Sequence, residues 1–264
     1  MSDDRGATRA ESGTASAEPT RAVLLDFGGT LTESRSDMRP AFEAAAQRCG
    51  AELPWPELEA AMAAAWEELW PEAPGLLGRR PGFADLVHER ALRRIGVAGP
   101  IDRMVDCMRE EAVAPRWHRP YPEVDAALAA LGERGVSLHL LSNNVDYLPH
   151  LVRNLGWEGR FASITYSQEL GVAKPDPRLF RLALARTGEP AGAVVHLGDS
   201  WESDYLGARA AGIRAVWLNR TGTPAPFACE EVHDLRGFVA WVNRLRPGTA
   251  PEAAERPSTR GGER

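Results

Sequence analysis

The sequence predicts an α/β fold, in which a parallel sheet has helices on both faces and a separate helical unit is inserted after the first strand. An apolar run, Ala22-Val23-Leu24-Leu25, reads as a buried strand that ends at Asp26 and two glycines. From Trp117 onward, strand-like and helix-like segments alternate, which is typical of a parallel sheet. Between these regions, residues 37–116 carry helical patterns.

The two ends of the chain have compositions typical of disorder. Residues 1–20 are rich in Ser, Thr, Ala, Gly and charge, and residues 247–264 are rich in Pro, Gly, Glu and Arg. We therefore expect a disordered leader and a disordered tail around the folded part. The α/β core then takes residues 21–36 and 117–246, and the helical insert takes residues 37–116.

Local start and stop signals place the elements in order. Prolines at first-turn positions and glycine stops mark the helices of the insert, and Asp176 caps a later helix before Pro177. The helices expected in the insert are 40–49, 56–70, 83–95 and 101–112. In the core, helices are expected at 121–131, 148–155, 176–187, 203–211 and 235–245, and strands at 136–141, 161–166, 194–197 and 215–218.

Composition limits the class of protein. The 264 residues are 44% hydrophobic and 26% charged, as in ordinary soluble globular proteins. The net charge of -6 and the pI near 5.6 argue against nucleic acid or an anionic membrane as a partner. No apolar run is long enough to span a bilayer and we see no signal-peptide core, so a cytoplasmic location is expected.

The cysteines are odd in number and far apart in sequence, which favours free thiols: Cys49, Cys107 and Cys229.

Polar residues follow the first two core strands at their carboxyl ends. In open α/β sheets ligands bind at this edge, and the glycines after Asp26 allow the backbone to approach a ligand closely. Ser142 and Asn143 follow the second strand, just before a helix. A hydroxyl and backbone amides at a helix start form a natural anion site, although Ser142 and Asn144 could equally cap that helix.

Charged residues complete the pattern. Lys174 is the only lysine among 31 basic residues and precedes a tightly specified turn, where it could lie beside a phosphoryl oxygen or hold carboxylates together. A solvated surface lysine is the alternative. Asp199 ends a strand and Asp204 begins a helix, so with Asp26 three carboxylates gather near one edge. Such a cluster is costly without a cation, and its hard oxygen ligands suit Mg²⁺.

These four segments resemble the four ordered motifs of the haloacid dehalogenase superfamily. The matching residues are Asp26 to Thr30, Ser142-Asn143, Lys174-Pro175, and Gly198-Asp199 with Asp204. The helical insert resembles the superfamily's type 1 cap, and the resemblance covers about residues 21–245. It implies a Rossmann-like core and a Mg²⁺-dependent hydrolase in which Asp26 attacks phosphorus and forms an aspartyl-phosphate on a small phosphorylated substrate.

The resemblance also implies a role for each motif residue. The residues that would bind the phosphoryl group are Thr30, Ser142, Asn143 and Lys174, and Lys174 would also neutralise charge. The metal ligands would be Asp26, the backbone carbonyl of Gly28 and Asp199, with Asp204 supporting the metal from near by. Such roles agree with phosphoryl transfer, where positioning and charge neutralisation supply most of the rate.

One position departs from the superfamily pattern. Its phosphatases have a second aspartate two residues after the nucleophile, where this chain has Gly28. That aspartate protonates the leaving group, and general acid catalysis is worth about 10² to 10⁴ in rate. We therefore expect a substrate with a good leaving group, such as an acyl or aryl phosphate, or an acid borrowed from elsewhere. His88 and Glu33 are the candidates, although each also reads as an ordinary surface side chain.

Other functions stay open. A phosphonatase is similar in carrying a small residue at the Gly28 position, but it needs a cap lysine, and Lys174 belongs to the third motif. A dehalogenase is similar in using the aspartate on carbon, but its site is metal-free, and the acidic motif at 198–204 argues against it. A third possibility is a non-catalytic descendant that binds a phosphorylated ligand or a protein.

The tryptophans of the insert are expected to pack in its core rather than to contact substrate: Trp55, Trp66 and Trp70. The sequence does not place Trp201 or define the oligomeric state.

Overall fold

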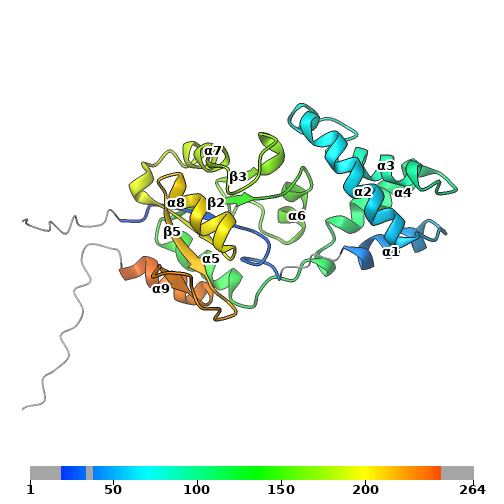
Figure 1. Cartoon of the computed structure of the whole chain (residues 1–264). Coiled ribbons are helices and arrows are strands. Elements are labelled where there is room, and N and C mark those ends of the chain that lie inside the picture. The colour runs from blue at the N-terminus through cyan, green and yellow to red at the C-terminus, as the bar shows by residue number, and fades with distance from the viewer. Residues whose placement is uncertain (1–18, 34–37, 245–264) are drawn as a thin grey trace, which may run out of the picture.

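The computed structural model describes residues 19–33 and 38–244, and its centre is a six-stranded parallel sheet (Figure 1). The strand order is β3-β2-β1-β4-β5-β6, so the first strand lies inside the sheet between β2 and β4. In this register Val23 lies beside Leu138 on β2 and Val195 on β4. The strands are β1 (Ala22–Leu25), β2 (Ser137–Ser142), β3 (Ser163–Tyr166), β4 (Val194–Gly198), β5 (Arg214–Leu218) and β6 (Glu231–Val232).

Helices cover both faces of this sheet, because successive side chains of a strand point to opposite faces and both are apolar. Val23 and Leu25 pack on the side of α5, α6 and α9, whereas Ala22 and Leu24 pack on the side of α7 and α8. The predicted α/β fold with helices on both faces is confirmed. The helices of this part are α5 (Val124–Glu133), α6 (Leu148–Asn154), α7 (Pro177–Thr187), α8 (Gly207–Ala210) and α9 (Leu235–Arg244).

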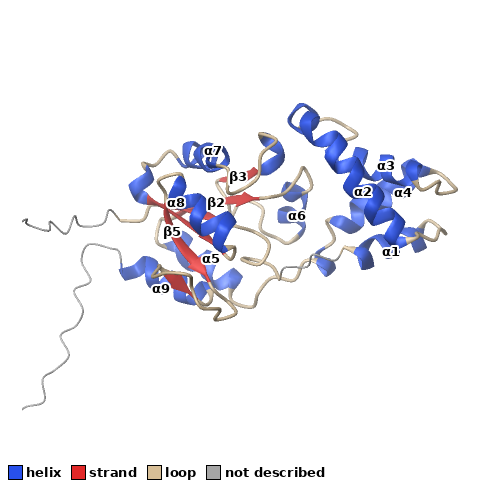
Figure 2. Ribbon diagram, in the orientation of Figure 1, coloured by secondary structure: helices blue, strands red, loops and turns tan. Residues whose placement is uncertain are grey.

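Four helices between β1 and β2 form a body of their own, which we call the helical unit (Arg39–Ala112). Figure 2 shows it beside the sheet, next to α6. Its core includes the fully buried side chains of Leu58, Leu92 and Met108. A second cluster joins Phe83 of this unit to Val145, in the loop before α6. The helices are α1 (Arg39–Arg48), α2 (Trp55–Leu69), α3 (Phe83–Arg94) and α4 (Ile101–Ala112).

Two predicted details differ in the structure. The helix expected at 203–211 is a π-helical turn (Trp201–Leu206) followed by the short α8. The turn starts early because the Ser200 hydroxyl accepts a hydrogen bond from the Ser203 amide at 3.1 Å. Strand β6 was not predicted, because two residues are too few to show a period of two. Short 3-10 segments also occur at Trp70–Leu76, Pro115–Trp117, Ser167–Glu169 and Ala191–Ala193.

Three further expectations concern the termini, the membrane and the thiols. The predicted tail and all but two residues of the predicted leader lie outside the described residues. In the described part of the chain, every helix is too short or too polar to cross a membrane. The cysteines are free thiols, but two of them are not far apart in space, because the Sγ atoms of Cys49 and Cys107 lie 2.9 Å from each other.

Candidate active site

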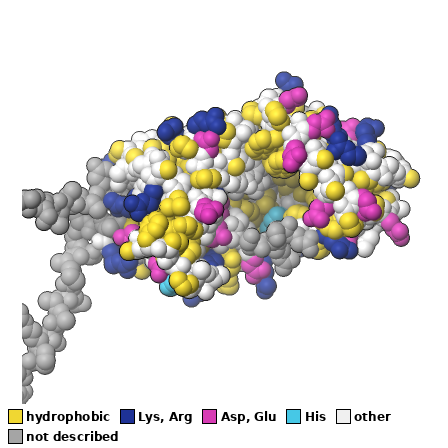
Figure 3. All heavy atoms as spheres, in the orientation of Figure 1, with side chains coloured by type: hydrophobic (Ala, Val, Ile, Leu, Met, Phe, Trp, Pro, Cys, Tyr) yellow, Lys and Arg dark blue, Asp and Glu magenta, His cyan; other side chains and the backbone are white. Residues whose placement is uncertain are grey.

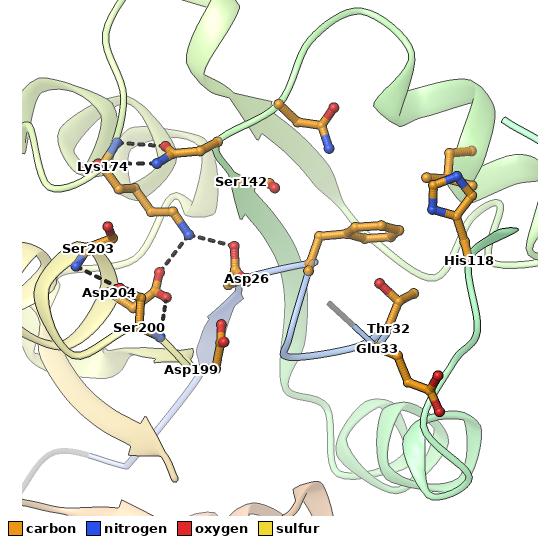
Figure 4. A pocket seen from close by; sticks show the side chains of 15 residues that line it. Asp26, Thr32, Glu33, His118, Ser142, Lys174, Asp199, Ser200, Ser203 and Asp204 are labelled. Carbon is orange, nitrogen blue, oxygen red and sulfur yellow. Dashed lines mark hydrogen bonds and ion pairs between the residues drawn. The ribbon is translucent and has the colours of Figure 1, made fainter. Parts of the chain in front are cut away.

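A cavity of about 310 Å³ opens at the carboxyl ends of β1, β2 and β4 (Figure 4). The parallel register explains its position, because residues that follow these strands meet at one edge of the sheet. All but one of the site residues predicted from sequence line it. They are Asp26, Gly28, Ser142, Asn143, Lys174, Asp199 and Asp204.

Lys174 joins two of the acids. Its Nζ donates to Asp26 Oδ1 at 2.6 Å and to Asp204 Oδ1 at 2.5 Å, and the side chain is buried. Burial works against its charge, but Asp204 and Asp26 outweigh burial and hold the pKa of the ammonium above its usual value. The only lysine of the chain is therefore a buried ion-pair partner, and the alternative of a solvated surface lysine is wrong.

Asn143 fixes the backbone of Lys174. The Lys174 amide donates to Asn143 Oδ1 at 2.7 Å, and Asn143 Nδ2 donates to the Lys174 carbonyl at 3.1 Å. This reciprocal pair joins the end of β2 to the loop before α7. The side-chain amide of Asn143 thus positions Lys174, whereas Ser142, at the end of β2, presents its hydroxyl at the cavity in Figure 4.

Asp204 has hydrogen-bond partners at both carboxylate oxygens. Besides Lys174, Oδ1 has His196 Nε2 at 2.9 Å, and Oδ2 accepts from the Ser200 amide at 3.0 Å. Burial raises the pKa of Asp204, but Lys174 and His196 outweigh this effect and hold that pKa well below its usual range. Gly198 is required here, because a Cβ at that position would lie 2.2 Å from Asp204 Cγ. Asp204 is therefore a fixed anion that orients Lys174.

Three carboxylates crowd this edge of the sheet. Asp26, Asp199 and Asp204 each offer an oxygen within 4.8 Å of the others. Burial raises the pKa of Asp26 to about 6 despite the attraction of Lys174, and burial together with Asp204 raises the pKa of Asp199. Burial is the larger cause of both shifts, and repulsion by neighbouring carboxylates adds to it, since three acids share one lysine. Since the oxygens of Asp204 are engaged, Asp26 and Asp199 are the carboxylates that could hold a cation, and hard oxygen donors of this kind suit Mg²⁺.

Thr30 is the predicted site residue that the structure does not bring to the cavity. It is fully buried, and its hydroxyl donates to Asp199 Oδ1 at 3.5 Å. The preceding residue explains this orientation: Gly29 has φ +79°, and a Cβ there would lie 2.2 Å from Asp199 Oδ2. The loop therefore turns tightly beneath Asp199. Thr30 supports that carboxylate, while Thr32 lines the cavity.

The place where the superfamily's phosphatases have their second aspartate is unoccupied space in this structure. Gly28 is exposed at the cavity, and among the described residues no atom beyond its two chain neighbours lies within 4 Å of where its Cβ would be. Glu33, one of the two candidate replacements, lines the cavity and forms an ion pair with Arg119 at 3.6 Å. His88, the other, does not line this cavity. It is buried in the helical unit rather than at the surface, and its ring packs on Phe42 with centroids 5.1 Å apart.

His88 makes stability depend on pH. Burial lowers the pKa of its imidazole to about 4, with Asp85 opposing and Arg109 assisting the shift. Because the folded-state pKa lies below that of the unfolded chain, the unfolded chain binds more protons between these values. We expect His88 to contribute a loss of stability of about 3 kcal/mol as the pH drops from above 6.5 to 4. Asp26, whose pKa is raised to about 6, works in the opposite direction, because the folded protein then binds the extra proton. Urea unfolding of wild type and of a variant without His88, at several pH values, separates the two contributions.

A matched pair of variants isolates that contribution. The difference in unfolding free energy between wild type and His88→Gln should change by about 3 kcal/mol between pH 6.5 and 4, in favour of the variant at low pH. His150→Gln, at an exposed position on α6, should keep the wild-type slope. Equal slopes in wild type and His88→Gln would contradict the assignment. A neutral His88 at physiological pH, outside the cavity, is also a poor source for the proton that Gly28 cannot donate.

Some cavity residues were not predicted. Ser200 and Ser203 line the cavity beside Asp204, and His118 lies on its opposite side in Figure 4. Ser200 follows Asp199 directly and precedes a helix start, so its capping pattern could have indicated it. His118 stands in a polar stretch with no motif. Its position where the helical unit rejoins the core is visible only in the fold.

This architecture defines a class of protein, namely a Rossmann-like enzyme with an acidic site at the end of its first strand and a helical insert beside that site. Comparison with known protein families matches residues 20–212 to the haloacid dehalogenase-like hydrolases. The chain belongs to this family, as the four sequence motifs indicated.

Relatives within the family have different activities. The haloacid dehalogenase-like hydrolase domain-containing protein 3 of Danio rerio is 31% identical over 209 residues, which cover 76% of this chain and 86% of that protein. A phosphoserine phosphatase of Thermus thermophilus is 32% identical over 225 residues, covering 76% and 89%. The crystal structure of a 2-haloacid dehalogenase from Pseudomonas syringae pv. Tomato DC3000 aligns with a TM-score of 0.66 and 26% identity, covering 86% of this chain and 100% of that one.

Proposed function

We propose that this protein is a Mg²⁺-dependent phosphatase that hydrolyses a small phosphorylated molecule through an aspartyl-phosphate at Asp26. The observation that carries the proposal is the cluster of Asp26, Asp199 and Asp204 around one buried lysine. Three carboxylates, two of them buried, face one lysine, and this surplus of negative charge favours a bound cation. A cation at this edge would attract the phosphate dianion.

The chain's own residues supply the remaining steps. Lys174 binds Asp26 Oδ1, which leaves Oδ2 to attack phosphorus. The hydroxyl of Ser142 and the ammonium of Lys174 then face the phosphoryl oxygens. Bound Mg²⁺ at Asp26 and Asp199 would supply further charge neutralisation. The leaving oxygen departs with its electron pair, and water afterwards cleaves the acyl phosphate to regenerate Asp26 and release inorganic phosphate.

Dehalogenation is the second candidate, because the Pseudomonas syringae dehalogenase is among the solved structures that this chain resembles. In that reaction the same aspartate would attack carbon and displace halide. The acidic cluster favours the phosphatase, because attack on a neutral carbon centre gains little from a gathered cation. A third outcome is a protein that binds a phosphorylated ligand without turnover.

Two assays of the same protein test this function. We expect phosphate release from acetyl phosphate and 4-nitrophenyl phosphate with Mg²⁺, and a loss of about 10²-fold or more when EDTA removes the metal, because a bound metal supplies several kcal/mol of charge stabilisation. Excess Mg²⁺ should restore the rate. The parallel assay measures chloride release from 2-chloropropionate in EDTA.

The outcomes separate the three functions. Chloride release without phosphate release would replace the phosphatase by a dehalogenase. Absence of both activities, with a melting temperature that rises with Mg²⁺ and phosphate, would indicate a binding protein. Phosphate release that EDTA does not affect would contradict the role of the acidic cluster.

A further inference from the structure

A second cavity of about 450 Å³ lies beside the first, between the helical unit and α6. The two cavities meet, because His118, Asn144 and Leu151 line both. Figure 3 shows a hollow between the sheet and the helical unit whose walls carry hydrophobic side chains. Its volume falls within the range of small-molecule pockets, about 300–1,000 Å³. We call it the aromatic cavity, and its apolar lining includes Met38, Phe42, Trp55, Met62, Trp66 and Leu148.

The aromatic walls are held in place by neighbouring rings. Trp66 is 39% exposed, yet its ring stacks on Trp70 with centroids 5.3 Å apart and meets the edge of Phe83 at 4.9 Å. Trp55 packs against Phe42 at 6.2 Å. Trp55 packs against the core of the helical unit as expected, whereas Trp66 is partly exposed, and both rings also line the aromatic cavity. A rigid, partly exposed aromatic wall can stack on a flat ligand group with little loss of conformational entropy.

The polar groups in these walls do not favour an anion. The lowered pKa of His88 keeps its imidazole neutral, and Tyr147 turns its hydroxyl to donate to Asp85 Oδ1 at 2.8 Å. Glu59 is an exposed carboxylate in the lining. The lining contributed by the described residues includes no lysine or arginine. An uncharged apolar group therefore fits this cavity better than a carboxylate does.

We propose that the aromatic cavity binds the organic part of the substrate, and that the substrate is an aryl phosphate, the phosphate monoester of a phenol. This inference rests on the proposed phosphatase function. In the first step the bond from phosphorus to the aryl oxygen breaks, the electron pair stays on that oxygen, and a new bond joins Asp26 to phosphorus. The phenolate leaves without prior protonation and later takes a proton from water. Gly28, which cannot donate a proton, is consistent with such a leaving group.

Two adjacent alanines on α2 provide the test. Ala63 and Ala64 are both exposed, but only Ala63 lines the aromatic cavity. We expect Ala63→Phe to reduce the ratio of kcat/KM for 2-naphthyl phosphate to kcat/KM for acetyl phosphate by about tenfold, because the added ring occupies space that the naphthyl group needs. Ala64→Phe should leave this ratio unchanged. The ratio cancels any loss of folded protein.

A binding measurement separates this inference from the proposed function. The product 2-naphthol carries no phosphate, so its binding does not depend on catalysis. We expect it to quench the fluorescence of Trp55 and Trp66 in wild type and in Ala64→Phe, and to bind about tenfold more weakly to Ala63→Phe. If acetyl phosphate is hydrolysed but both measurements are the same in the two variants, the aromatic cavity is not the substrate site. Faster turnover of phosphoglycolate than of 2-naphthyl phosphate would also overturn the inference. Failure of wild type to hydrolyse any of these phosphates would instead overturn the phosphatase.

Discussion

Asp26→Asn is expected to lower kcat for 4-nitrophenyl phosphate by about 10⁴-fold or more, since it removes the atom that would attack phosphorus. An amide is a poor nucleophile and a weak ligand for Mg²⁺, so both the covalent step and the metal site are impaired. Saturating substrate and excess Mg²⁺ isolate the chemical step in this measurement. A variant that keeps more than about a hundredth of the wild-type kcat would show that Asp26 is not the nucleophile.

The same variant should stay folded. The amide oxygen of Asn can still accept a hydrogen bond from Lys174, which contacts Asp26 Oδ1 at 2.6 Å in the wild type. Burial already disfavours the charge of Asp26, whose pKa is raised to about 6. Removing that charge relieves crowding with Asp199, so the melting temperature should not fall. Asp102→Asn, in the exposed first turn of α4, is the matched control and should keep the wild-type kcat.

The fold and much of the site could be predicted because they follow from the pattern of apolar and polar residues within short segments of the sequence. Apolar runs define the strands, and the carboxyl ends of parallel strands share an edge, so Asp26, Ser142 and Asp199 had to meet. The orientation of a side chain within a loop is not fixed in this way. Thr30 turns beneath Asp199 because of the backbone of Gly29, and Asn143 binds the backbone of Lys174, which lies 31 residues away.

Contacts between helices that are far apart in sequence also cannot be predicted from hydrophobic periodicity. The pairing of the Cys49 and Cys107 thiols depends on how α1 packs against α4. The aromatic cavity depends on how α2 faces α6, and a helical spacing of tryptophans describes a buried stripe and a ligand wall equally well. The lining of the aromatic cavity is thus the part of this structure that the sequence predicts least.

Gly28→Asp is expected to raise kcat/KM for an alkyl phosphate, such as glycerol 2-phosphate, by at least about tenfold. General acid catalysis contributes about 10² to 10⁴ in rate, and imperfect placement of a new carboxyl group would realise only part of it. The described part of the fold has room for the side chain, because none of its atoms beyond the two chain neighbours lies within 4 Å of the Cβ position. The φ of Gly28 also lies outside the left-handed region that Gly29 occupies, so an aspartate adds no backbone strain there.

Gly28→Asn is the matched control, because it has nearly the same shape but no acidic proton. We expect it to leave the alkyl phosphate rate near that of wild type. The gain in Gly28→Asp should also be smaller for 4-nitrophenyl phosphate, whose leaving group departs without protonation, so the ratio of the alkyl to the aryl rate should rise. Equal rates for the Asp and Asn variants on the alkyl substrate would mean that the proton comes from elsewhere. Glu33, which lines the same cavity, would then be the residue to replace next, since an acid already in place makes a second one redundant.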